Sequence, residues 1–254
     1  MRANVLIGLI ALTALCACAE PSDEPTATPQ TPTSSVPASP TTATTTEPTT
    51  TEPTTTPTPT PTSTPGQEKS LTAALLPADQ LPPLTSSTPW RRAPLSIDTV
   101  SVCQRVSLPS IGATRIARRA YAVADTDAIA SQVVAAFPDS LTAGYGFDIL
   151  QAWLRSCGKR IVAAGYNRTD VPGSYTSLDV GDRAGWAVFF YGPVPGDANA
   201  AYIQAEALVV DGNHLSWVVQ RSIGQDYNYG SGKSPPELAA PLMAARLSTL
   251  AASA

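Results

Sequence analysis

The segment GSGKS at residues 230–234 has the composition of the end of a phosphate-binding loop, which would cradle the phosphates of a nucleotide. A complete loop of this kind has an earlier glycine, and Tyr227 occupies the position where that glycine would stand. Two prolines follow the segment, so we expect no helix to begin directly after Lys233 and point its N-terminus at a phosphate. The sequence therefore predicts a Gly-rich loop in place of a nucleotide site, with these candidate ligand-binding residues: Asp226, Tyr227 and Tyr229.

The other side chains that could support catalysis do not form a recognisable set. His214 is the one histidine of the chain and stands beside an expected hairpin turn, and no G-x-S-x-G motif is present. Turns or helix starts are expected at two pairs of carboxylates, Asp125 with Asp127 and Asp179 with Asp182. Residues 70–254 contain two glutamates, Glu206 and Glu237, and no motif supports them as a glycosidase-type pair. We therefore predict that the protein is not an enzyme and holds no metal or cofactor.

Two further groups of side chains could contact a ligand. Arg115, Arg118 and Arg119 either hold an anion such as a phosphate or carboxylate, or line a solvated strand face and pair with nearby aspartates. The aromatic residues that precede GPVPGD at 192–197 either belong to the core of a sheet or line a small-molecule cleft: Trp186, Phe189, Phe190 and Tyr191. From these groups, Tyr191 and Arg118 join the candidate ligand-binding residues.

The first residues have the layout of a secretory signal peptide, with Arg2, a short apolar run over 5–15 and then small residues. The apolar run is too short to span a bilayer, because a membrane helix takes about 20 apolar residues. Residues 15–18, Leu-Cys-Ala-Cys, resemble a bacterial lipobox, so we predict residues 1–17 as the signal peptide and lipid on Cys18. The alternative is a cleavable signal without lipid. A lipoprotein cysteine usually carries more than one acyl chain, which suffices for stable anchoring on the extracytoplasmic side of the cell membrane.

Removal of the signal and lipidation of Cys18 leave two cysteines, Cys103 and Cys157. Two thiols in an oxidising compartment normally pair. We therefore predict a Cys103–Cys157 disulfide, which would stabilise the fold by roughly 3–5 kcal/mol in the chain-entropy model.

Residues 18–69 are almost entirely Thr, Pro, Ser, Ala and Glu after the lipidated cysteine. Such a segment has too few large apolar residues to offset the entropy of folding, so we predict a disordered stalk. The frequent prolines favour polyproline II, in which the stalk could reach roughly 150 Å. It either holds a domain at a distance from the membrane or acts as a passive tether, and its composition is typical of O-glycosylated segments.

Residues 70–254 have the length and apolar content of one domain. They contain 14 Lys and Arg and 14 Asp and Glu, so this domain is formally neutral. A nucleic-acid-binding domain would carry a basic patch, and we expect no nucleic-acid partner.

Hydrophobic periodicity predicts the elements that position these side chains. Helices are expected over 70–76, 140–157 and 236–250, and strands over 101–106, 115–123, 130–137, 175–180, 184–191, 201–210 and 214–223. In the main helix, Asp139 or Ser140 is the expected N-cap and Gly158 the expected C-cap, and an apolar face is expected at Leu141, Tyr145, Ile149 and Trp153. Short turns such as Asp211-Gly212-Asn213 join strands that neighbour in sequence. The predicted fold is α+β, an antiparallel sheet with the main helix and the C-terminal helix packed on it.

Three parts of this domain resemble the PknH-like extracellular sensor domain: LLPADQLPP at 75–83, Cys103, and FPDSLTAGYGFDILQAWLRSC at 137–157. Domains of this family form the outer part of mycobacterial receptor kinases and occur as stand-alone actinobacterial lipoproteins. The resemblance implies a cleft-bearing α+β domain that binds an unidentified ligand. The kinase members usually have two disulfides, whereas this chain can form one, and it has no kinase domain through which to signal.

These observations together predict a membrane-anchored extracytoplasmic lipoprotein with a ligand-binding or sensor domain, in a high-GC Gram-positive bacterium. The expected partners are the membrane, through the lipid on Cys18, and either a small envelope ligand or an envelope protein. The alternative function is a cell-envelope interaction module without a small ligand. A deep apolar cleft would favour the first function and a flat exposed apolar patch the second.

Overall fold

The structure, a computed structural model, describes residues 71–85, 88–95, 101–168 and 175–251. The predicted signal peptide at 1–17, the predicted lipidation site at Cys18 and the predicted stalk lie outside the described residues.

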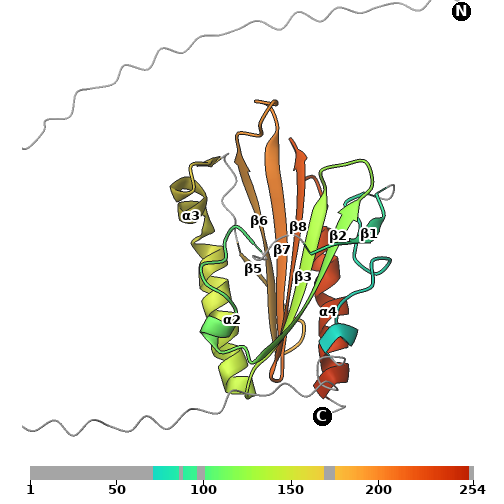
Figure 1. The fold of residues 1–254 in the computed structure, drawn as a ribbon, viewed down its shortest axis with the longest axis vertical. Helices are drawn as coiled ribbons and strands as arrows, with labels where there is room; N and C mark the ends of the chain where they lie inside the picture. Colours follow the sequence, from blue (N-terminus) through green and yellow to red (C-terminus); the bar gives the residue numbers. More distant parts are fainter. Residues whose placement is uncertain (1–70, 86–87, 96–100, 169–174, 252–254) are drawn as a thin grey trace, which may run out of the picture. The chain divides into compact units, whose positions relative to one another are not determined.

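An eight-stranded antiparallel sheet forms the centre of the fold (Figure 1). The strands lie in the order β1-β2-β3-β8-β7-β6-β4, and β5 pairs separately with β6. Their bounds are β1 Trp90–Ala93, β2 Arg115–Val123, β3 Ile129–Ala136, β4 Asn167–Arg168, β5 Thr176–Leu178, β6 Arg183–Gly192, β7 Ala201–Asp211 and β8 His214–Gly224. The long β7–β8 hairpin turns at Gly212, which has φ 54°, and the Asp182 carboxylate accepts a hydrogen bond from the Gly212 amide. The predicted hairpin is therefore confirmed, and Asp182 caps it from the bend before β6.

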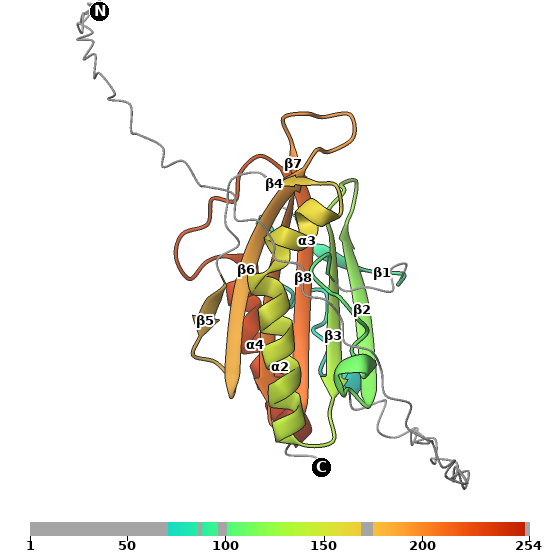
Figure 2. The same cartoon turned by 90° about the vertical axis from the view of Figure 1, so that its left-hand side faces the viewer.

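Helices cover both faces of this sheet. One face, here called the α2 face, carries α2 (Ser140–Arg155) and, beyond it, α3 (Cys157–Ala163); the other, the α4 face, carries α4 (Pro235–Ala251) (Figures 1 and 2). A single 3-10 turn, η1, spans Pro109–Ile111. Leu208 and Val209 are neighbours on β7 and point to opposite faces, yet both are fully buried. The α+β prediction is confirmed, and each face of the sheet has its own core.

The Pro-rich segment before β1 packs on the α4 face. Its helical part is limited to residues 71–73, shorter than the predicted helix over 70–76. The segment is tied to the sheet by buried glutamines, since the Leu76 amide donates to Gln132 (2.7 Å) and Gln220 donates to the Pro82 carbonyl (2.9 Å). Trp90 on β1 also donates to the Pro82 carbonyl (2.9 Å).

The main helix differs from its prediction at its C-terminal end. Asp139 caps the N-terminus as predicted, because its carboxylate accepts from the Thr142 amide (2.7 Å). The helix ends at Arg155, where the Ser156 hydroxyl donates to the Ala152 carbonyl (2.6 Å) and competes with helix continuation. A second helix then begins at Cys157, so the predicted C-cap at Gly158 is wrong.

The buried face of α2 also differs from its prediction. Leu141 and Tyr145 are 66% and 60% exposed, whereas the buried face consists of Ala143, Gly146, Phe147, Leu150, Trp153 and Leu154. Gly146 sets this rotation, because a Cβ there would lie 2.7 Å from the Phe137 ring. The close approach of α2 to Phe137 therefore requires a residue without a side chain at position 146. A search for large apolar residues at helical spacing does not find this contact.

The predicted strand over 101–106 is wrong, because these residues form turns. The Cys103 amide donates to the Ser101 hydroxyl (2.9 Å), a local bond that competes with strand pairing. The predicted disulfide is confirmed and joins Cys103 to Cys157 at the start of α3.

We expect replacement of both Cys103 and Cys157 by alanine to lower the free energy of unfolding by about 4 kcal/mol, because the bond closes a loop with a sequence separation of 54. Urea unfolding followed by circular dichroism measures the change. Dithiothreitol should lower the stability of the wild-type protein similarly and leave the double variant unaffected. An unchanged unfolding midpoint in the double variant would contradict the role assigned to the bond.

Candidate functional site

A cavity of about 130 Å³ opens on the α2 face, between the sheet and the segments on either side of residues 96–100. Leu95, Ile129 and Val219 supply much of its apolar wall, and Ser101, Gln204 and Arg221 are among its polar lining residues. An engineered apolar cavity of about 150 Å³ binds benzene, so this space suits a small ring or a short chain.

Strand register explains why these side chains meet. Ala120 pairs with Ser131, Ser131 with Val219, and Val219 with Glu206, so one row of side chains runs across β2, β3, β8 and β7. Side chains in one such row point to the same face of the sheet. The cavity lies over the first three members, and the fourth member, Glu206, is a buried carboxyl group.

Glu206 is fully buried and receives three hydrogen bonds. One carboxylate oxygen, Oε1, accepts from the Ser101 hydroxyl and from Gln204 Nε2, both at 2.6 Å. The other oxygen, Oε2, accepts from the Trp217 indole at 2.7 Å. Tyr191 extends this network, because its hydroxyl donates to Gln204 Oε1 (3.2 Å). The cavity therefore ends against a connected set of buried polar groups.

Burial raises the pKa of Glu206 to about 7, although the three donors favour its ionised form. Burial also raises the pKa of Tyr191 above its ordinary value. A carboxyl group that titrates near neutrality could donate or accept a proton, but Glu206 does not line the cavity, and neither does any other carboxylate of the described residues. Glu237 lies on the other side of the sheet, where it accepts from the Ser234 amide at the start of α4 (3.2 Å). The two glutamates therefore do not form a glycosidase pair.

A shallow depression of about 330 Å³ adjoins the cavity and shares four lining residues with it: Ala93, Pro94, Leu95 and Ala120. Three arginines, Arg92, Arg118 and Arg119, also line it. Arg119 donates to the carbonyls of Leu75 (3.1 Å) and Leu76 (2.7 Å), so its guanidinium anchors the segment before β1.

The structure does not bring the predicted ligand-binding residues together. Tyr191 belongs to the polar network behind the cavity, and Arg118 lines the depression. The aromatic run of β6 divides between the faces: Phe189 and Tyr191 lie in the core of the α2 face, whereas Trp186 and Phe190 point to the α4 face.

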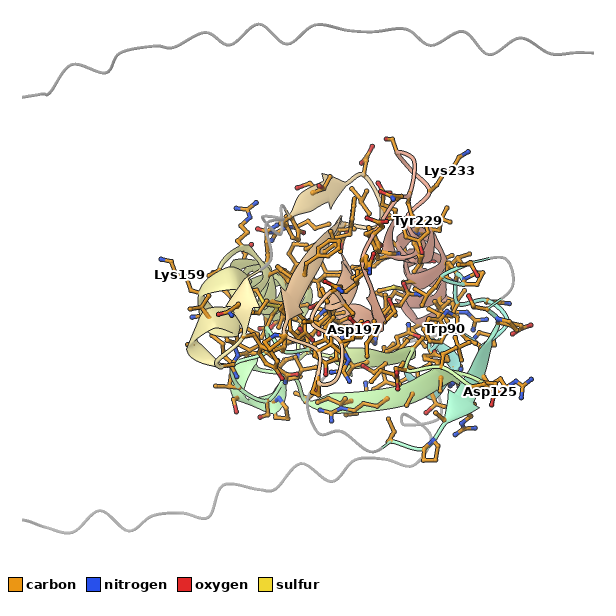
Figure 3. The ribbon with its side chains drawn as sticks, turned by 90° about the horizontal axis from the view of Figure 1, so that it is seen from above. Trp90, Asp125, Lys159, Asp197, Tyr229 and Lys233 are labelled. Carbon is orange, nitrogen blue, oxygen red and sulfur yellow. A yellow bond between two sulfur atoms is a disulfide. The ribbon has the colours of Figure 1, made fainter. Side chains whose placement is uncertain are left out.

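Residues 225–234 pack on the α4 face. Tyr227 contacts Phe190 and Tyr229 edge-on, with ring centroids 6.4 Å and 4.6 Å away, and the Tyr229 hydroxyl donates to the Leu84 carbonyl (2.5 Å). Figure 3 shows Tyr229 and Lys233 well apart from Lys159 of α3. Asp226 is exposed, and this loop lines neither of the two cavities.

The start of α4 differs from our expectation, because the helix begins at Pro235 itself. Ser234 and Glu237 have the spacing of a capping box, and the Glu237 carboxylate accepts from the Ser234 amide. The position that a phosphate would take at this helix N-terminus is therefore occupied by the protein's own carboxylate.

Other side chains that could take part in catalysis or metal binding lie away from the cavity. Asp125 has φ 59° in the turn between β2 and β3. His214 is buried at the start of β8, whereas the cavity residue Arg221 lies near the other end of this strand. Burial lowers the pKa of His214. No group of three or more His, Cys, Asp and Glu among the described residues could hold a metal ion. No helix in the described part of the chain is long and apolar enough to cross a membrane.

No protein-family model matches the chain, and no curated protein matches it. Among solved structures, it is similar to the crystal structure of the extracellular domain of PknH from Mycobacterium tuberculosis, with 15% identity and a TM-score of 0.42. The match covers 73% of this chain and 96% of that chain. The relationship is a distant one, of fold alone.

The pH dependence of stability should report the buried carboxyl group. The folded protein keeps the Glu206 proton up to about pH 7, whereas the unfolded chain loses it near the ordinary glutamate pKa of 4.5. This contribution to stability is therefore full below pH 4.5 and is lost as the pH rises through about 7. The wild type is compared with Glu206→Gln by the difference between their free energies of unfolding. We expect this difference to fall by on the order of 3 kcal/mol as the pH rises from 4.5 to about 7. Urea titrations at several pH values measure it, and parallel curves for the two proteins would contradict the assignment.

Proposed function

We propose that residues 70–254 form a ligand-binding or sensor domain, held on the extracytoplasmic side of the cell membrane by lipid on Cys18. The observation that carries this proposal is the cavity on the α2 face, with its apolar wall and its buried polar end. Concave apolar sites with a few placed polar groups are typical of small-molecule binding.

The arrangement of the site favours binding over catalysis. The hydrogen-bonding groups beside Glu206 are directed at its carboxylate and at one another, and do not point into the cavity as a catalytic group would. Buried networks in which every member is satisfied make a site rigid. We infer that this network shapes the cavity and leaves the ligand chemically unchanged.

The alternative function, a protein-interaction module without a small ligand, has two observations in its favour. Leu141 and Tyr145 are exposed one turn apart on α2, and Leu238 and Leu242 are exposed one turn apart on α4. Each pair forms a smaller feature than the cavity, which combines an apolar lining with polar groups. We therefore prefer ligand binding.

Filling the cavity tests the binding function. Ala120 lines the cavity and is half-buried; Ala122 is half-buried on the same face of β2 but does not line it. In a thermal-shift screen of the mature protein against envelope lipids, glycans and muropeptides, a bound compound should stabilise the wild type and the Ala122→Leu variant. The Ala120→Leu variant should lose that stabilisation, about 2.7 kcal/mol at a hundredfold excess over Kd. Equal responses in both variants would place the ligand elsewhere.

Membrane attachment is tested separately. Cys18→Ala in the full chain, made in a host that processes lipoproteins, should move the protein from the membrane pellet to the supernatant. Cys16→Ala is the matched control, because we expect this residue to leave with the signal peptide. A Cys18→Ala protein that still sediments with membranes would show that the lipobox is not used.

A further inference from the structure

The side-chain donors at the polar end of the cavity point into the protein when Glu206 is ionised. The Ser101 hydroxyl donates to Glu206 Oε1 and accepts from Gln204 Nε2 and from the Cys103 amide. Gln204 Nε2 directs its N–H groups to Glu206 (2.6 Å) and to Ser101 (3.1 Å). Ser101 and Gln204 line the cavity, yet a ligand oxygen would meet no unused hydrogen on either of these side chains.

A proton added to Glu206 changes this arrangement. Its Oε1 atom and the Ser101 hydroxyl oxygen are 2.6 Å apart, and the line between two such oxygens takes one hydrogen. A proton on the other oxygen, Oε2, would lie beside the Trp217 indole, which is itself a donor at 2.7 Å. We therefore expect the proton on Oε1, donated to Ser101, and the hydrogen of the Ser101 hydroxyl must then rotate away from the carboxyl group.

We propose that the cavity binds a small apolar molecule with one hydrogen-bond acceptor, such as a carbonyl oxygen, and that binding is coupled to uptake of one proton by Glu206. The apolar wall takes the body of this molecule, and the rotated Ser101 hydroxyl donates to its oxygen. This proposal rests on the proposed function and names the class of the ligand and the group that regulates its binding.

The exchange of this proton falls in an accessible pH range. Burial raises the pKa of Glu206 to about 7, so the carboxyl group is mostly protonated at about pH 5.5 and mostly ionised at about pH 8.5. A molecule that binds the protonated form more tightly therefore binds better at the lower pH. Because coupling is reciprocal, the bound molecule in turn favours the protonated form of Glu206.

The strands beside β7 bring two other titratable or charged groups near Glu206. Tyr191 of β6 donates to Gln204, and burial raises the pKa of its hydroxyl above the ordinary value, so this group stays protonated over the same range. Arg221 of β8 lies beyond Gln204, its strand partner, and interacts with the Tyr191 hydroxyl. Neither group exchanges the proton that the coupling requires.

The elements that cover Glu206 leave the carboxyl group as the titrating member of the network. The Cys103 sulfur lies 3.5 Å from Oε1 and carries no proton, because it belongs to the disulfide. Arg160 of α3 donates to the Val102 carbonyl (2.8 Å). Asp98, between the two segments that line the cavity, lies outside the described residues. The buried face of α2 is free of charged residues: Ala143, Gly146, Phe147, Leu150, Trp153 and Leu154.

Two compounds of the same shape test the coupling. Acetophenone has a carbonyl oxygen where α-methylstyrene has a methylene group, and neither compound titrates. Each is added to the mature chain carrying Cys18→Ala at about pH 5.5 and about pH 8.5, and binding is followed by amide chemical shifts in ¹H–¹⁵N spectra. We expect acetophenone to bind roughly three- to tenfold more tightly at the lower pH, and α-methylstyrene to bind equally at both.

Variants assign the pH dependence to this pair of side chains. Glu206→Gln has no titrating group at this position, and Ser101→Ala lacks the hydroxyl that would rotate, so each should bind acetophenone equally at the two pH values. Ser107→Ala is the matched control, because Ser107 is exposed on the same connection and lines neither cavity. This variant and Asp98→Asn should keep the pH dependence of the wild type. The same spectra show whether each variant is folded.

The outcomes separate this proposal from the one on which it rests. Equal acetophenone affinity at the two pH values, with binding lost in Ala120→Leu, would overturn the proton coupling and keep the binding function. A pH dependence that persists in Glu206→Gln, disappears in Asp98→Asn or is shared by α-methylstyrene would also overturn it. No shift at cavity residues with either compound would overturn both proposals.

Discussion

Strand β7 is buried on both faces, so every polar side chain in its middle must find hydrogen-bond partners within the protein. Gln204 and Glu206 find them in Ser101, Trp217 and Tyr191, which come from three other parts of the chain. An unpaired carboxyl group at this depth would cost several kcal/mol. The position of the 101–103 turn is therefore set by the needs of the strand beneath it, and the wall of the cavity follows from that position.

Patterns that depend on neighbouring residues could be predicted from the sequence. The β7–β8 hairpin follows from Asp211-Gly212-Asn213, and the start of α2 follows from Asp139, because both signals are local. The buried face of α2 could not be predicted in this way. It is fixed by the contact of Gly146 with Phe137, in which the smallest residue marks the interface and leaves Leu141 and Tyr145 exposed.

The candidate site was harder to predict than the fold, because its residues come from five strands and the connection that follows β1, which meet only through long-range register. Alternating Gln204 and Glu206 resemble the solvent face of a half-buried strand, and nothing nearby in sequence indicates that Trp217 and Ser101 will cover them. One local signal was available and missed: Ser234 and Glu237 have the spacing of a capping box, which explains the start of α4.

The Cys103–Cys157 bond has a consequence that concerns cell biology more than stability. It holds the turn from which Ser101 reaches Glu206, and Ser101 and Val102 line the cavity. A copy of the chain retained in a reducing compartment would lack the covalent tether beside the cavity. The turn that forms this wall would then be fixed in place only after the chain has reached an oxidising compartment.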